Sequence, residues 1–330
     1  MVGRPPGRDL AADALRGLAI LLVVLGHAIS NAIDLNHAAR SDPLFILSNF
    51  IYTFHMPLFM AVAGYVLYAR RIKVPDRATR LLLPFLAWIP VYWFVNRYLR
   101  HFPWPVRFGT TLKDTILRPG AGLWFLPTLF LCTLLLLVAV RLEKERWWLG
   151  EVSLAAMFVG VNFIPYDNLG LVQVKYFFFF FAAGYLLAKH RPRLERLGAG
   201  QVNAALALAS AAFLGLFALF YRSGALKPYL FPITLPDLFK TPGTYLVRYL
   251  MAVLGVFACV ALVRALGRGT PGNALAWFGL VTMDIYVAHG LMVQLAFGGG
   301  WVKVLAGFVL GVVLSLVLTL FILRQWWVTA

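Results

Sequence analysis

Long apolar runs recur along almost the whole chain, and short polar segments rich in arginine and lysine separate them. A run of about 20 apolar residues is long enough for a helix to cross a hydrocarbon layer of about 30 Å. Backbone polar groups in lipid must be satisfied within their own segment, and the residue types here favour helices over barrel strands. The pattern therefore predicts an all-α integral membrane protein, a polytopic bundle of about ten transmembrane helices.

These helices leave no room for an appended soluble domain, so residues 1–330 are expected to form one transmembrane domain. Two connections, 98–121 and 222–241, are long enough to be either solvated connectors or functional loops. We expect helices at 9–32, 43–69, 78–97, 122–140, 148–165, 170–189, 200–221, 242–266, 273–297 and 301–323.

Composition and charge narrow the class further. The chain is 61% hydrophobic and only 13% charged, whereas a soluble domain has about 25% charged residues. The net charge of +17 comes from short basic clusters between apolar runs, which is a poor pattern for nucleic-acid binding. With the N-terminus inside, 17 basic residues fall on that side and 11 on the other. Both termini are therefore predicted to be cytoplasmic.

The two cysteines and the N-terminal region call for no special chemistry. Cys132 and Cys259 lie within apolar runs, so we expect two buried side chains, no disulfide and no metal site. Arg4 and Arg8 precede an apolar stretch in the manner of a signal peptide. Arg16 interrupts that stretch and no clear small-residue cleavage site follows, which favours an uncleaved first helix.

Polar residues within the first apolar run are the main candidates for chemistry, because charged groups in a bilayer are paired, face a wet cavity or carry function. Arg16 and His27 are eleven residues apart. Eleven residues turn a helix through about 1100° and rise about 16 Å, so both side chains share one face. Arg16 and Asp13 could instead form a simple pair at a helix end, and His27 could be a packing histidine.

Two further apolar runs contain histidines. Pro57 deprives the Thr53 carbonyl of its helical partner, and the resulting kink can open space beside His55, although an ordinary kink with a packed histidine is the alternative. Tyr286 and His289 lie in the ninth predicted helix with Asp284. Asp284 is expected to pair with another helix, with Arg248 as one candidate, in either a structural or a functional ion pair.

Several of these residues lie in motifs that resemble the acyltransferase-3 family of bacterial membrane acyltransferases, in particular its fucose 4-O-acetylase-like branch. The resemblance runs in order from the first to the ninth predicted helix, with Ala63 where the family often has serine and Asp284 at a variable position. The motifs are Asp13-Ala-Leu-Arg16-Gly-Leu-Ala with His27, Phe50-Ile-Tyr52-Thr-Phe-His55-Met-Pro57 with Ala63-Gly64-Tyr65, Leu123-Trp124-Phe125-Leu126, Phe177 to Tyr185, and Thr282-Met-Asp284-Ile-Tyr286-Val-Ala-His289.

The resemblance implies a bacterial inner-membrane enzyme that moves an acyl group, usually acetyl, from cytoplasmic acetyl-coenzyme A to a hydroxyl of a carbohydrate or lipid-linked glycan. We expect His27 to be the general base or an acyl relay, because histidine titrates near neutral pH. Arg16 and Trp124 are expected to bind the donor, Arg16 through charge-assisted hydrogen bonds. His55, Tyr286, His289 and Asp13 are additional candidates for the site.

A glycan transporter or flippase without acyl-transfer activity is the competing class. Many transporters consist of repeated halves with paired interrupted helices. Neither feature is evident in the sequence, which favours the enzyme.

Overall fold

The structure is a computed structural model that describes residues 9–33, 39, 41–68, 72–99, 108–119, 123–166, 168–221 and 242–323. Every regular element in these ranges is helical, as predicted. Residues 100–107, 120 and 121 of the first long connection, and residues 222–241 of the second, lie outside the described residues. The described part of the first connection contains one short helix, α4 (Phe108–Leu117).

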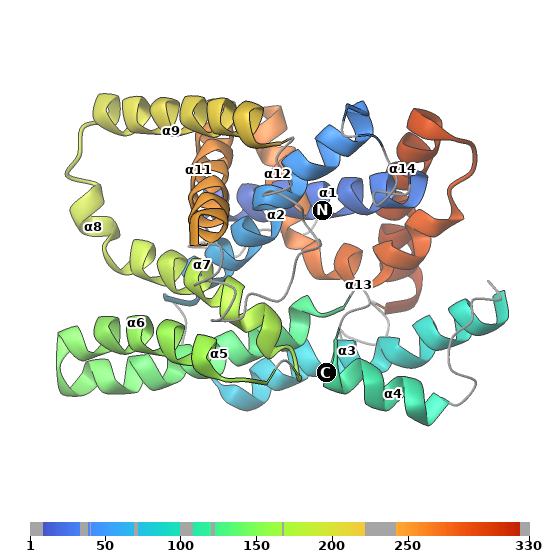
Figure 1. Cartoon of the computed structure of the whole chain (residues 1–330), viewed down its shortest axis with the longest axis horizontal. Helices are drawn as coiled ribbons and strands as arrows, with labels where there is room; N and C mark the ends of the chain where they lie inside the picture. The colour runs from blue at the N-terminus through green and yellow to red at the C-terminus, as the bar shows by residue number, and fades with distance from the viewer. Residues whose placement is uncertain are drawn as a thin grey trace. The chain divides into compact units, whose positions relative to one another are not determined.

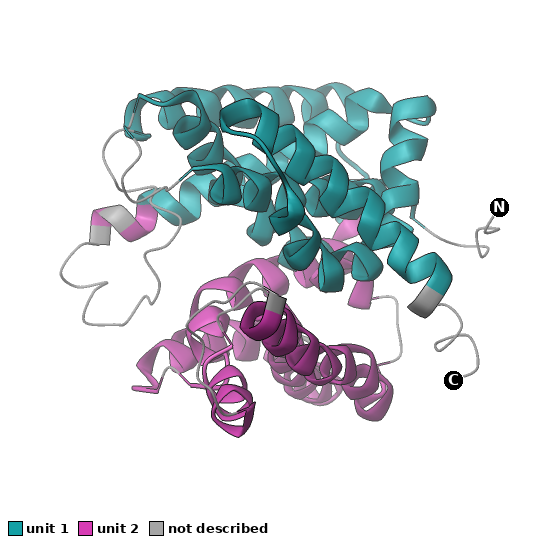
Figure 2. Cartoon of the chain, turned by 90° about the vertical axis from the view of Figure 1, so that its right-hand side faces the viewer, with its two compact units in different colours: residues 1–62, 192–227, 247–330 teal, residues 63–191, 228–246 magenta. Residues whose placement is uncertain are grey.

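The chain divides into two compact units, which Figure 2 shows in different colours. Unit 1 comprises residues 1–62, 192–227 and 247–330, and unit 2 comprises residues 63–191 and 228–246. Each unit is described by itself below.

Unit 1 is built around the first helix, which contacts the last three helices of the chain (Figure 1). Ile20, Val24 and Ile29 of this helix are fully buried. The helices of the unit are α1 (Leu10–Ala32), most of α2 (Pro43–Tyr68), α9 (Ala199–Phe220), most of α11 (Pro242–Leu266), α12 (Thr270–Leu280), α13 (Thr282–Met292) with the 3-10 turn η2 (Val293–Leu295), and α14 (Gly300–Leu318) with the π turn η3 (Thr319–Leu323).

Unit 2 contains the middle of the chain. Within it, α5 packs beside α6, as Figure 1 shows. Its helices are α3 (Val74–Phe94) with the π turn η1 (Val95–Leu99), α4, α5 (Phe125–Glu145), α6 (Trp147–Phe163) and α7 (Leu171–Lys189), and the short α8 (Arg191–Leu194) follows at the boundary between the units. Lys189 lies 2.9 Å from Glu143 and 3.0 Å from Glu151, and these ion pairs join the end of α7 to α5 and α6.

Helices are found in all ten predicted segments. Among the described residues, eight helices are long and apolar enough to cross a membrane, and the bent pair α12 and α13 would be a ninth span. The apolar part of α6, Trp148–Phe163, is shorter. The number of crossings and the cytoplasmic position of both termini remain predictions.

The prediction of one continuous helix over 273–297 is wrong. The chain bends by 79° between α12 and α13. At the break the Thr282 hydroxyl donates to the carbonyl oxygens of Phe278 and Gly279, at 3.1 and 3.0 Å. The side chain therefore gives the last carbonyl groups of α12 a hydrogen-bond donor where the helix ends. A hydropathy pattern cannot reveal such a break, because both halves are apolar.

Candidate active site

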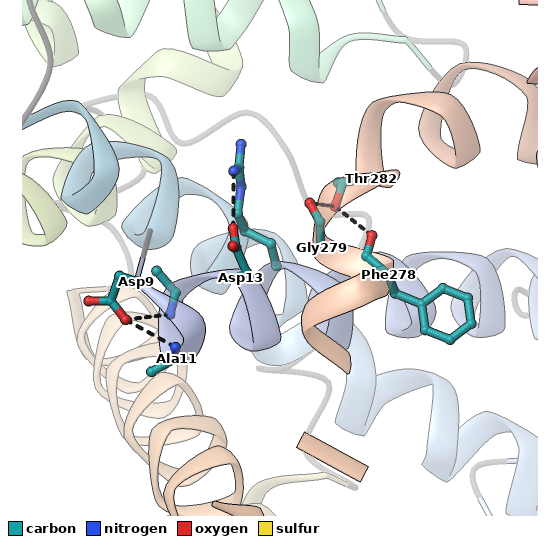
Figure 3. A network of polar contacts seen from close by, with 8 residues as sticks. Asp9, Ala11, Asp13, Phe278, Gly279 and Thr282 are labelled. Atoms are coloured by element: carbon teal, nitrogen blue, oxygen red, sulfur yellow. Dashed lines mark hydrogen bonds and ion pairs between the residues drawn. The ribbon is translucent and has the colours of Figure 1, made fainter. Parts of the chain in front are cut away.

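The first turns of α1 carry the acidic and basic pair that the sequence singled out. Asp9 caps the helix by accepting from the backbone amides of Ala11 and Ala12 at 3.0 and 3.2 Å, as Figure 3 shows. One turn later the Asp13 carboxylate lies 3.9 Å from the Arg16 guanidinium, with 5% and 31% of the two side chains exposed. The pair at the helix end therefore exists, and Arg16 still has exposed surface.

Close backbone packing brings this end of α1 against the break between α12 and α13. A Cβ atom on Gly279 would meet the backbone carbonyl of Asp13, and one on Gly17 would meet the carbonyl of Leu275. The two glycines let α1 and α12 approach without side chains between them. Asp13 is consequently beside the bend, together with the Thr282 cap (Figure 3).

About three turns after Arg16 in the same helix, His27 of α1 contacts His289 of α13. Their ring centroids are 5.0 Å apart and the planes are almost perpendicular, at 85°. His289 is buried, whereas His27 is half-buried. The two histidines lie 262 positions apart in the sequence, and the packing of α13 against α1 brings them together.

The tautomer of His289 follows from its surroundings. Its Nδ1 lies 2.6 Å from the carbonyl oxygen of Tyr286 and 3.2 Å from that of Ile285. A carbonyl can only accept, so Nδ1 carries the proton and Nε2 keeps its lone pair. Nε2 is buried and makes no hydrogen bond within the described part of the chain. The site therefore contains a buried nitrogen that can accept a proton or a hydrogen bond.

His55 of α2 has the same arrangement. It is buried, and its Nδ1 lies 2.8 Å from the Ile51 carbonyl, so its lone pair is also on Nε2. Its ring contacts the Tyr52 ring at 4.8 Å. Both His55 and His289 lie near enough to His27 that a positive charge on one ring would disfavour a charge on the other. The structure therefore brings all three candidate histidines together in unit 1.

Tyr52 and Ser30 lie beside these histidines, but the sequence analysis did not single them out as site residues. The Tyr52 hydroxyl lies 3.3 Å from the Ser30 hydroxyl, and Ser30 donates to the Gly26 carbonyl at 3.0 Å. Tyr52 reaches α1 because Gly26 has no side chain to block it. A serine one turn after the predicted base was the available signal, but serine is common in membrane helices.

The remaining candidates of α13 are less informative. Tyr286 is buried, and its ring centroid is 5.7 Å from that of His289. Asp284 is half-buried in the first turn of the helix. Its predicted pairing with Arg248 stays a prediction.

Trp124 belongs to unit 2, where its ring stacks on Phe177 at 5.1 Å and 23°. Its predicted role in donor binding therefore stays a prediction. Another residue of this unit, Lys175 of α7, is only 2% exposed. Lys175 lies in the second turn of α7, within the predicted helix over 170–189, but its burial is not evident from the sequence. A buried lysine in an apolar helix is a functional candidate by default.

The described residues hold no group of three or more histidine, cysteine, aspartate or glutamate side chains that could bind a metal ion. Cys132 and Cys259 are free and buried, as predicted. The imidazole side chains of the histidine cluster can accept protons, act as nucleophiles or position each other.

Comparison with known proteins identifies a family. A family model described as an acyltransferase domain, Acyl_transf_3, matches residues 9–324. No solved structure shows a significant match.

Two curated relatives are both described as nodulation protein NolL. The protein from Mesorhizobium japonicum is 30% identical over 192 residues, which are 55% of this chain and 48% of the relative. The protein from Sinorhizobium fredii is 29% identical over 191 residues, 55% of this chain and 49% of the relative. The matched segment thus spans about half the length of each relative.

Proposed function

The chain belongs to the acyltransferase-3 family, and from this premise we propose that it transfers an acetyl group from cytoplasmic acetyl-coenzyme A to a hydroxyl of a carbohydrate or lipid-linked glycan. The bacterial relatives and the apolar helices support a place in a bacterial inner membrane. The observation that carries the proposal is the histidine cluster around His27, because it offers basic nitrogens inside an apolar unit that also contains Arg16.

The chemistry requires a base. A thioester is activated toward attack, but a sugar hydroxyl becomes a good nucleophile only when its proton is removed. In direct transfer, His27 accepts that proton while the hydroxyl oxygen attacks the thioester carbonyl. The carbon–sulfur bond breaks, and the proton passes from His27 to the leaving thiolate. The products are the acetyl ester and free coenzyme A.

A relay through His27 uses the same residue. Here a ring nitrogen of His27 attacks the thioester, the carbon–sulfur bond breaks and coenzyme A leaves as a thiolate. An acceptor hydroxyl then takes the acetyl group from the acetyl-imidazolium, and the proton that the hydroxyl releases neutralises the thiolate. Acetyl retained on the protein after exposure to radiolabelled acetyl-coenzyme A alone, and lost on addition of acceptor, would distinguish this route.

Arg16 fits a role at the donor. It lies eleven residues before His27 on the same helix, a rise of about 16 Å. That span is comparable to an extended pantetheine arm, so a nucleotide held near Arg16 could present its thioester to His27. Charge-assisted hydrogen bonds from the guanidinium suit the donor phosphates.

The test uses purified protein in detergent with acetyl-coenzyme A and a panel of octyl glycosides that includes octyl fucoside. We expect thiol release with matching acetylation of one or more glycosides by mass spectrometry. His27→Ala should lower turnover by about 10²–10⁴-fold, the usual cost of losing a general base. Its expression and coenzyme A binding should stay normal.

Near-normal turnover in His27→Ala would place the base elsewhere. Movement of glycans across proteoliposome membranes, without acetylation of any glycoside, would instead favour the transporter hypothesis. For that alternative the one broken span found among the described residues is insufficient support, because transporter sites typically use a pair of interrupted helices in corresponding halves.

A further inference from the structure

His289 Nε2 is a buried ring nitrogen of unit 1 that makes no hydrogen bond within the described part of the chain. The residue is 1% exposed, and its other ring nitrogen is committed to the carbonyl groups of its own helix. Because Nδ1 faces α13, Nε2 lies at the far edge of the ring. Leaving a buried acceptor without a hydrogen bond costs about 1–3 kcal/mol. Native structures keep few such atoms, so each calls for an explanation.

His27 is in position to supply that hydrogen bond. Two imidazoles joined by an N–H···N bond of about 2.9 Å have their centroids about 5 Å apart, and the observed separation is 5.0 Å. The terminal torsion of a histidine is broad and roughly two-fold, so a ring can reorient about it at low cost. A turn of the His27 ring could thus direct one N–H at His289 Nε2 without any movement of the helices.

We propose that His289 is a positioning residue for His27: its Nε2 accepts a hydrogen bond from one nitrogen of His27 and so leaves the other unprotonated for the reaction. This inference rests on the proposed function, since it assumes that His27 is the reacting histidine. It gives His289 a specific role in the site. The family match covers residues 9–324 but assigns no role to any single residue.

The proton balance is closed. The hydroxyl proton moves to the free nitrogen of His27, and the resulting imidazolium keeps its other proton in the bond to His289. The positive charge is stabilised because the acceptor lone pair faces it. When the carbon–sulfur bond breaks, His27 gives the first proton to the thiolate, and both histidines return to their starting forms. In the relay route the same hydrogen bond leaves the nucleophilic lone pair of His27 available.

This role resembles that of the aspartate in a serine protease triad, which orients its histidine and stabilises the imidazolium. A neutral imidazole suits an apolar helix bundle better than a carboxylate, because burying an ion costs several kcal/mol. The two hydrogen bonds from His289 Nδ1 to α13 serve the same end, since they prevent that ring from offering a donor to His27.

The experiment is a double-mutant cycle of turnover with an octyl glycoside that the wild-type protein acetylates. The variants are His27→Ala, His289→Phe and the double substitution, with His289→Gln as the conservative variant. Phenylalanine keeps a ring but has no acceptor, whereas the glutamine oxygen can take the place of Nε2. His190→Gln is the matched control, because His190 pairs with Glu151 in unit 2 and is outside the site.

We expect His289→Phe to lower kcat by about 10–100-fold with little change in KM for the donor, less than the loss of the base itself. His289→Gln should recover part of that loss, and His190→Gln should be unaffected. In the His27→Ala background, His289→Phe should have no further effect, since residues that act as a unit are not additive.

A wild-type kcat in His289→Phe would overturn the inference. So would an equal fold-loss of kcat from His289→Phe in the wild-type and His27→Ala backgrounds. In both cases the proposed function would stand. If His27→Ala itself keeps normal turnover, the proposed role of His27 fails first. Should His289→Phe not be recovered in folded form, the same cycle is run with His289→Gln and His289→Leu, and the same two outcomes decide.

Discussion

Arg16 combines a neighbouring carboxylate with exposed surface. The guanidinium lies 3.9 Å from the Asp13 carboxylate, at the long end of an ion pair, and 31% of its side chain is exposed. Arginine has five N–H donors and part of the Arg16 side chain is exposed, so a contact with Asp13 does not by itself exclude hydrogen bonds to a phosphate group. The pair at the helix end and the donor role, which are alternatives in the sequence, are therefore compatible in the structure.

The donor role of Arg16 can be tested by binding alone. We expect Arg16→Ala to weaken coenzyme A binding, measured by calorimetry, while the protein still folds and inserts. Loss of one charge-assisted hydrogen bond corresponds to about 1.5–3 kcal/mol, or roughly a 10–150-fold rise in Kd. Arg16→Lys should recover only part of the affinity, because an ammonium group cannot reproduce the planar fork. Unchanged affinity in Arg16→Ala would leave Arg16 as a helix-end anchor.

At the level of elements, the contact between α1 and α12 determines where the polar end of α1 lies. Gly17 and Gly279 permit a backbone approach that any side chain would block. The 79° bend comes directly after Gly279 in the sequence, where α12 ends. The next helix, α13, runs in a new direction, and its His289 contacts His27. The packing of two glycines is thus connected to the geometry of the histidine pair.

Gly279→Ala tests this connection. The new methyl group would meet the backbone carbonyl of Asp13, so the helices must separate. We expect the free energy of unfolding to fall by about 1–3 kcal/mol, which is typical of overpacking, and the unfolding midpoint in detergent to be lower. Gly215→Ala on α9 is the matched control, because a Cβ there meets nothing within 4 Å. Alanine is the better helix former, so the control should be unchanged or slightly more stable. Equal behaviour of the two variants would contradict the close contact.

For the whole molecule, orientation in the membrane decides from which side the donor arrives. The basic clusters near Arg193 are predicted to be cytoplasmic, and those near Lys113 to be outside. Lys113 and Arg193 are both exposed, so each can be replaced by a reporter cysteine. The native Cys132 and Cys259 are buried and should contribute little background.

We expect Lys113→Cys in intact cells to react with an impermeant maleimide, and Arg193→Cys to react only after the membrane is opened. The physical reason is the bias of arginine and lysine toward the cytoplasmic side. The opposite labelling pattern would reverse the orientation and place Arg16 on the outer side, away from cytoplasmic acetyl-coenzyme A.

Local information was sufficient for the class of the protein and for most of its helices. The length and apolar character of a membrane span are properties of a continuous stretch of chain, so each of the ten predicted segments contains helix, although the one over 273–297 is broken. The order of short motifs around Arg16, His27 and His289 was sufficient for the family, which the match over residues 9–324 confirms. Arg16 and His27 could be related to each other because they share one helix with a fixed period.

Only the tertiary structure decided what depends on contacts between helices. The 79° break after Leu280 arises where α12 meets α1, and hydropathy is the same on both sides of it. The burial of Lys175 depends on the packing around α7, which no charge count contains. The contact of His27 with His289, and the tautomer that leaves Nε2 unpaired, follow from the fold of distant segments and from backbone carbonyl groups. These carbonyl groups belong to every residue alike, so their placement is invisible in the sequence.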